Sequence, residues 1–258
     1  MAIANSSAQY GQLPFQFVNG FGIQNDPYNP DTVLNIFYGR TLDSYYTYQL
    51  SMNPGILLIN LNIVGAGGID NGVLTSNKVY GVYVIWDSVG SNLPTCMISS
   101  SYYHPLVPAG YTAVKLIGYA ATDGSGNFRR AQWNKYGSAA YRNMIYTPSV
   151  VALQNGTANV QTNVDLISYI PNIASQIVNL QLSFTSSTPG NSLTIYSDMG
   201  SFQLYAQAAN IPNTSFTNLV VTNQVVLNNV VSPVIGYSVT NSGTDTASIY
   251  CNGYDFFL

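Results

Sequence analysis

Hydrophobic and polar residues alternate in short runs along most of the 258-residue chain, and turn-forming residues separate the runs. The clearest alternation is VNLQLSF at residues 178–184, where every second side chain is apolar; this predicts a strand with one buried face. The run VYGVYVIW at residues 79–86 is apolar at nearly every position. That pattern predicts a central strand that is covered on both faces.

Further strand-like runs follow at intervals of about 8–12 residues, and no segment has the period of a helix. The sequence DGSGN at residues 123–127 lies between two runs and predicts a hairpin turn. This spacing is typical of an all-β fold, with two antiparallel β-sandwich or jelly-roll-like domains in tandem. The other expected strands are residues 15–18, 33–38, 45–50, 56–64, 95–99, 113–120, 128–133, 163–167, 193–196, 202–206, 216–221, 225–228, 235–240 and 247–251.

The domain boundaries follow from the gaps in this pattern. Residues 1–14 are small and polar, and we expect an N-terminal arm that anchors the chain to a neighbouring protein. Residues 15–135 form the first expected domain and residues 149–258 the second. Residues 136–148 lie in the least strand-like stretch, so we interpret them as the linker.

The chain carries very little charge. Charged residues make up 7% of it, against about 25% in an average soluble protein, and every acidic residue is Asp. A surface of neutral amides and hydroxyls suits a protein inside an assembly or outside a cell. The net charge of −3 offers no basic field for nucleic acid, so we expect no nucleic-acid partner.

The first residues contain neither a basic segment nor an apolar segment of the kind found in secretory signals. No apolar run reaches the roughly 20 residues of a membrane span. We therefore expect synthesis in the cytoplasm and no membrane insertion.

Residues suited to catalysis or metal binding are scarce. His104 is the only histidine, no motif of the G-x-S-x-G type is present, and the two cysteines are far apart in the sequence. We expect no catalytic residue, no metal and no cofactor, and we interpret Cys96 and Cys251 as buried free thiols. Two alternatives stay open: an Asp pair that cleaves glycans, and a calcium site at the loop of Asp70.

Clustered tyrosines are the best candidates for a contact surface, because tyrosine is amphipathic enough to lie exposed at an interface. Tyr102 and Tyr103 fall in an expected loop beside His104, while Tyr45 and Tyr46 fall in an expected strand. These five residues are our candidates for contacting a receptor or another subunit. The alternative is that the tyrosines only pack within the sheets.

Two neighbouring stretches carry a recognisable set of motifs: residues 69–91, IDNGVLTSNKVYGVYVIWDSVGS, and residues 107–132, which contain VPAGYTAVKLIGYAATDGSGNF. The residues that define these motifs are Asp70, Gly72, Tyr83, Pro108, Gly110, Tyr111, Gly118, Thr122, Asp123, Ser125, Gly126 and Asn127. With them the chain resembles a recurrent β-domain of tail and head fibres in tailed bacteriophages. The sequence departs from that pattern at Lys115, where arginine is commoner.

Another part of the chain, residues 164–182 with residues 236–256, resembles the C-terminal β-sandwich that often follows this domain. The resemblance implies a virion protein assembled in the host cytoplasm, a homotrimer, and a position on the particle exterior. It covers most of residues 20–256, and its motifs are those of turns and packing.

The expected function is therefore structural: a compact exterior fibre, decoration or tail-tip subunit of a phage particle that acts by binding. Its expected partners are other copies of itself and capsid or tail proteins reached by the N-terminal arm. A host surface glycan is a further expected partner. The alternatives are a receptor-binding protein for host glycans and a glycan-cleaving spike.

Overall fold

The computed structural model of the chain describes residues 3–5, 18–37, 39–43, 48–51, 55–133, 141–173, 176–188, 190–197, 200–205, 216–227 and 233–257. These residues contain strands, turns and loops but no helix, and so no helix that could cross a membrane. Every strand pairing whose register is described is antiparallel. The prediction of an all-β, antiparallel fold is confirmed.

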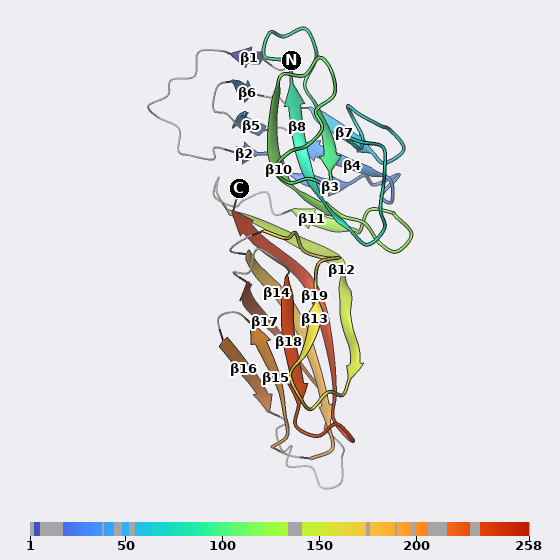
Figure 1. Ribbon diagram of the computed structural model, residues 1–258, viewed down its shortest axis with the longest axis vertical. Coiled ribbons are helices and arrows are strands. Elements are labelled where there is room, and N and C mark those ends of the chain that lie inside the picture. The colour runs from blue at the N-terminus through green and yellow to red at the C-terminus, as the bar shows by residue number, and fades with distance from the viewer. Residues whose placement is uncertain are drawn as a thin grey trace. The chain divides into compact units, whose positions relative to one another are not determined.

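The chain divides into two compact units, an N-terminal unit of Met1–Ile145 with Phe257–Leu258 and a C-terminal unit of Tyr146–Phe256. In the N-terminal unit the strands form three sheets, with the orders β1-β6-β5-β2, β10-β8-β9 and β11-β3-β4-β7 (Figure 1). The strands are β1 (Ile3–Asn5), β2 (Val18–Gly20), β3 (Ile23–Asn25), β4 (Val33–Phe37), β5 (Gly39–Leu42), β6 (Gln49–Ser51), β7 (Ile56–Asn60), β8 (Val79–Trp86), β9 (Thr95–Ser99), β10 (Ala113–Ala121) and β11 (Ala131–Trp133).

The C-terminal unit consists of two four-stranded arrays, β17-β14-β19-β12 and β13-β18-β15-β16. Counted from one to eight along the chain, these orders are 6-3-8-1 and 2-7-4-5, the arrangement of an eight-stranded jelly roll. The strands are β12 (Tyr141–Gly156), β13 (Thr162–Asp165), β14 (Gln176–Ser186), β15 (Ser192–Ser197), β16 (Gly200–Tyr205), β17 (Phe216–Leu227), β18 (Val234–Val239) and β19 (Thr246–Phe257). Because the N-terminal unit has three sheets, two jelly rolls in tandem are not confirmed.

Strands β8 and β14 follow their sequence patterns closely. All eight residues of β8 are buried, as expected for a strand covered on both faces, and β8 is central in its sheet, between β10 and β9. In β14 the apolar series Val178, Leu180, Leu182 and Phe184 is buried, and the polar residues between them are half-buried. The hairpin turn is present as well, because Thr122 pairs with Phe128 across residues 123–127.

The structure describes parts of the expected linker and of the expected N-terminal arm, and both parts are strands. Residues 141–148 of the expected linker belong to β12, in which Met144 and Tyr146 are buried while Ile145 and Thr147 are exposed. This alternation builds a strand despite Pro148. In the expected arm, Ile3–Asn5 form β1 and pair with β6. The remaining residues of both segments lie outside the described ranges.

Candidate functional site

The predicted contact residues Tyr102, Tyr103 and His104 lie in the loop of residues 100–112, which connects β9 to β10 and is called here the β9–β10 loop. Tyr103 is 75% exposed and His104 is exposed as well, so both side chains are accessible. Leu106, two residues further on, is 64% exposed. Tyr45 and Tyr46 lie outside the described residues.

Tyr102 has a different role, because its half-buried side chain holds the loop against the sheet. The Tyr102 hydroxyl donates a hydrogen bond of 3.1 Å to the main-chain oxygen of Val79 at the start of β8. Its ring lies edge-on to Tyr119 of β10, with 5.3 Å between the ring centroids. Tyr102 is therefore an anchor of the loop rather than part of its exposed tip.

Two buried tyrosines of the sheet complete this aromatic cluster. The Tyr83 hydroxyl donates a hydrogen bond of 2.7 Å to the main-chain oxygen of Ser101. Burial raises the pKa of Tyr83, and the nearby charge of Asp70 raises it further. Burial also raises the pKa of Tyr119. Both phenols stay protonated at neutral pH, so Tyr83 remains a hydrogen-bond donor to the loop.

Short polar contacts fix the rest of the loop. The Ser99 hydroxyl accepts the Ser101 amide at 3.0 Å, and the Ser101 hydroxyl accepts the His104 amide at 3.1 Å. One carboxylate oxygen of Asp70, Oδ2, accepts the Leu106 amide at 3.0 Å. The Ser101 hydroxyl thus faces the backbone of His104, an arrangement that orders the loop.

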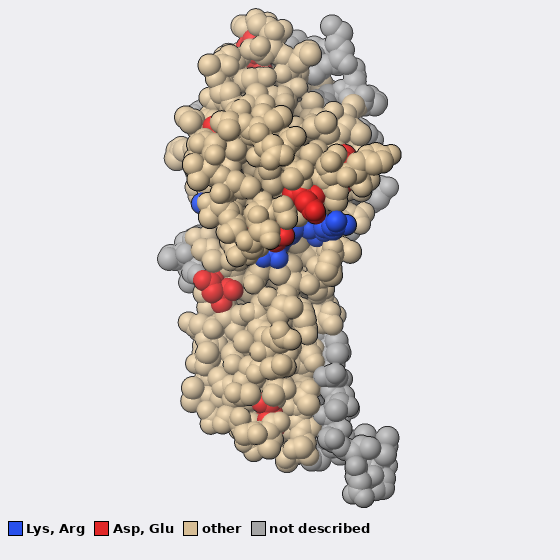
Figure 2. Space-filling view, turned by 90° about the vertical axis from the view of Figure 1, so that its right-hand side faces the viewer, with Lys and Arg blue, Asp and Glu red and all other residues tan. Residues whose placement is uncertain are grey.

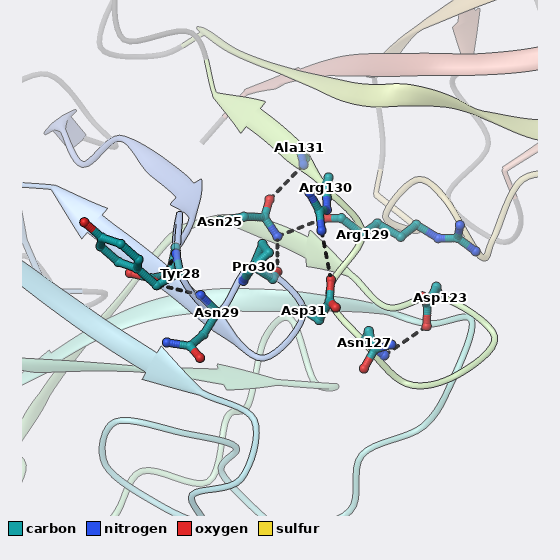
Figure 3. A network of polar contacts seen from close by, with 11 residues as sticks. Asn25, Tyr28, Asn29, Pro30, Asp31, Asp123, Asn127, Arg129, Arg130 and Ala131 are labelled. Carbon is teal, nitrogen blue, oxygen red and sulfur yellow. Dashed lines mark hydrogen bonds and ion pairs between the residues drawn. The ribbon is translucent and has the colours of Figure 1, made fainter.

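A second polar network lies around the turns of residues 26–31 and 123–127 (Figure 3). The Asn25 side chain donates to the main-chain oxygen of Pro30 at 2.7 Å and accepts the Ala131 amide at 2.9 Å. Arg130 and Asp31 form an ion pair at 3.5 Å in which both side chains are more than half exposed. Exposed pairs of this kind contribute about 0–1 kcal/mol, so the network is held mainly by Asn25.

Charge is sparse on the surface. On the face drawn in Figure 2, basic side chains gather mainly in one place beside acidic ones, and most of the face carries neither. Lys115 is among the buried residues; burial lowers its pKa, and the carboxylate of Asp43 opposes that effect. A surface of this kind offers little electrostatic attraction to a charged partner.

Most of the described aspartates accept hydrogen bonds from main-chain amides. Among the aspartates in the described ranges, seven accept main-chain amides: Asp26, Asp43, Asp70, Asp87, Asp123, Asp165 and Asp245. The hydrogen bond from the Asn29 amide is the main cause that lowers the pKa of Asp26, and the one from Val89 does so for Asp87. Burial works against ionisation of Asp245, but side-chain hydrogen bonds from Ser186 and Asn191 outweigh it and lower its pKa.

Metal-binding groups do not gather in the described ranges. No three His, Cys, Asp or Glu side chains lie close enough together there to hold a metal ion. The carboxylate of Asp70, the candidate calcium ligand, instead bonds to the backbone of the β9–β10 loop. Cys96 and Cys251 are buried and free, as predicted, and burial raises the pKa of the Cys96 thiol.

The residues behind the sequence resemblance build turns and loop anchors. Asp123 accepts the amides of Ser125 and Asn127, and the Thr122 hydroxyl bonds to the main-chain oxygens of Thr75 and Lys78. Gly118 packs so closely on Trp133 that a Cβ atom there would overlap the indole ring. Sequence reasoning missed Leu106 as an exposed residue, although an apolar residue between Pro105 and Pro108 was a usable signal.

The fold defines the class of protein: an all-β chain of antiparallel sheets, whose C-terminal unit has the strand order of a jelly roll. No protein-family model and no curated protein matches the chain. Weakly similar solved structures include the VP2 subviral particle of infectious bursal disease virus, with a TM-score of 0.27 and 11% identity over 98% of this chain and 74% of that chain.

A structure of the Gx strain of the same virus has a TM-score of 0.23 and 11% identity over 100% of this chain and 75% of that chain. A Bacillus thuringiensis Cry1Da tryptic core variant has a TM-score of 0.20 and 12% identity over 93% of this chain and 51% of that chain. Scores this low do not establish a common fold, and no function is inferred from them.

Proposed function

We propose that this protein is a structural component of a tailed-bacteriophage particle: a compact exterior fibre, decoration or tail-tip subunit. It assembles into the virion in the host cytoplasm and acts by binding rather than by catalysis. The observation that carries the proposal is the β9–β10 loop. Two of the residues that resemble the phage fibre domain, Asp70 and Tyr83, bond to the loop, and the loop presents Tyr103, His104 and Leu106 to solvent.

A pre-formed loop suits a protein that binds by shape, because little conformational entropy is lost when a partner docks. Hydrogen bonds from Tyr83 and Tyr102 and to Asp70 fix the loop before any partner is present. A low surface charge suits packing beside identical copies, and the resemblance to phage fibres favours a homotrimer. Repeated copies would turn weak single contacts into strong attachment.

The virion role is tested on purified particles of the phage that encodes this chain. Gold-labelled antibodies against the protein should bind intact particles at fixed positions, and quantitative mass spectrometry should give the same copy number in each preparation. A protein that stays in the lysate while particles band normally would contradict the proposal. Light scattering of the isolated protein tests the trimer, and a monomer at micromolar concentration would exclude it.

The second candidate function is the binding of a host surface glycan, and the exposure of Tyr103 favours it. An exposed aromatic ring can stack on a sugar face. Titration of host polysaccharide should show binding that Tyr103→Ala removes. The matched control is Tyr28→Ala, because Tyr28 is 90% exposed but lies in the turn after β3. Equal loss in both variants, or no binding by the unaltered protein, would contradict a glycan site at Tyr103.

A further inference from the structure

Main-chain hydrogen bonds hold the backbone around Asp70, independently of the Asp70 side chain. The Asp70 amide donates to the main-chain oxygen of Ile98 at 3.0 Å, and the Ile98 amide donates to that of Gly68 at 2.8 Å. A Cβ atom on Gly68 would overlap the main-chain carbonyl of Ile63, so the loop closes around a glycine at this point. Asp70 therefore extends from a segment that is bonded to the edge of β9.

The β9–β10 loop is held unevenly along its length. Its first half is bonded through Ser101, Tyr102 and the His104 amide. Its end is bonded as well, because the Thr112 amide donates to the main-chain oxygen of Trp86 and the Asn92 side chain donates to that of Gly110. Across residues 105–107, the structure shows one hydrogen bond, from the Leu106 amide to Oδ2 of Asp70. Val107 adds apolar packing against Tyr83, Ile85 and Met97.

The other carboxylate oxygen of Asp70, Oδ1, is buried and has no hydrogen-bond partner. The side chain as a whole is a buried polar group, so an unpaired oxygen there costs stability. A buried carboxylate with an unpaired oxygen therefore contributes little to the stability of the fold. The one side-chain hydrogen bond of Asp70 in the structure is the bond to the β9–β10 loop.

We propose that Asp70 is a positioning residue whose carboxylate latches residues 105–107, in the middle of the β9–β10 loop, and so fixes how His104 and Leu106 are presented to a partner. The latch extends the proposed function, because one side chain outside the loop, Asp70, would then determine the conformation of the binding surface. It rests on that function only in the claim that a partner docks there.

Amide hydrogen exchange resolved by residue tests the latch directly. In the unaltered protein, the Leu106 amide should exchange more slowly than the amides of Tyr103 and Val107, which donate no hydrogen bond in the structure. Asp70→Ala should speed exchange at Leu106 by about ten- to a hundredfold, the range expected for losing a hydrogen bond to a charged acceptor.

Asp70→Asn should keep most of the protection, because its side-chain carbonyl can replace Oδ2 as the acceptor. Asp123→Ala is the control, since Asp123 accepts amides in another turn and should leave Leu106 unchanged. Unchanged Leu106 exchange in Asp70→Ala, or equally fast exchange in Asp70→Asn, would overturn the latch. Should Asp70→Ala fail to fold, the comparison within the unaltered protein decides: fast exchange at Leu106 there would also overturn it.

Attachment of particles to host cells separates the latch from the proposed function. If both are correct, Asp70→Ala lowers attachment and Asp70→Asn restores it. If Leu106 exchange responds as expected but attachment does not change in either variant, the latch stands and binding through this loop is wrong.

Discussion

Strand β14 of the C-terminal unit and the β9–β10 loop of the N-terminal unit are both held in one conformation, but by different interactions. Every second side chain of β14 lies in an apolar core, and its backbone pairs with β17 and β19. The loop has no such alternation and depends on side chains from Asp70 and Tyr83, which are distant in the sequence. Local pattern specifies the strand, and a few long-range hydrogen bonds specify the loop.

The largest expected effect removes a core side chain of β14. Phe184→Ala should lower the free energy of unfolding by about 4 kcal/mol, because it removes a buried ring and leaves a cavity. Urea unfolding followed by circular dichroism measures the change. Gln181→Ala, on the other, half-buried face of the strand, should cost much less, because it removes no fully buried side chain. Similar losses in both variants would show that alternation does not fix β14.

A smaller effect is expected where close packing allows only a glycine. Gly118→Ala in β10 should lower the free energy of unfolding by about 2–3 kcal/mol, because the added methyl group overlaps Trp133. Gly124→Ala is the control, since a Cβ atom there would lie 3.7 Å from the Asn77 side chain, an ordinary contact. If both variants unfold at the same urea concentration, the tight approach at Gly118 is not a constraint on the fold.

A third effect concerns the carboxylates that hold turns. Asp26, Asp87 and Asp245 have pKa values below the ordinary value of 3.8. The folded state therefore binds fewer protons than the unfolded state near that pH, so the stabilisation is present above about pH 4 and is lost as the pH falls through the folded pKa values. Unfolding free energies from pH 7 to pH 2 should decrease below about pH 4.

Asp245→Asn should cost about 1–2 kcal/mol at pH 7, because its carboxylate accepts hydrogen bonds from Asn191 and from the Asn241 amide. The variant should also lose part of the acid dependence. Asp31→Asn is a suitable control, because Asp31 is exposed and its ion pair with Arg130 is weak. An acid dependence that is the same with and without Asp245 would contradict the role of its hydrogen bonds.

The sequence alone predicted the elements that depend on local pattern. Strands β8 and β9 and the alternation of β14 were predicted at their observed positions, because the spacing of apolar residues directly indicates which side chains of a strand are buried. The first part of β12 reads as a linker in the sequence, since Pro148 and nearby polar residues obscure the alternation of Met144 and Tyr146. A proline interrupts a strand pattern in the sequence even where the strand continues.

The candidate site was predicted in part. Its position in an exposed loop followed from SSSYYHP, because serine and proline mark loops. The difference between Tyr102 and Tyr103 did not follow, since it depends on the positions of Val79 and Tyr119, which only the folded sheet brings close. The role of Asp70 at Leu106 joins residues 36 positions apart, and no local pattern encodes such a contact.

The smallest expected effect separates these two adjacent tyrosines. Tyr102→Phe removes the hydroxyl that bonds to Val79 and should lower the free energy of unfolding by about 1 kcal/mol. Tyr103→Phe should change it by less than about 0.5 kcal/mol, because that hydroxyl has no hydrogen-bond partner and the side chain is exposed. Each variant is the control for the other in the same urea titration. Equal stability of the two would mean that the Tyr102 hydroxyl does not anchor the loop, which would leave Tyr83 and Asp70 as its long-range supports.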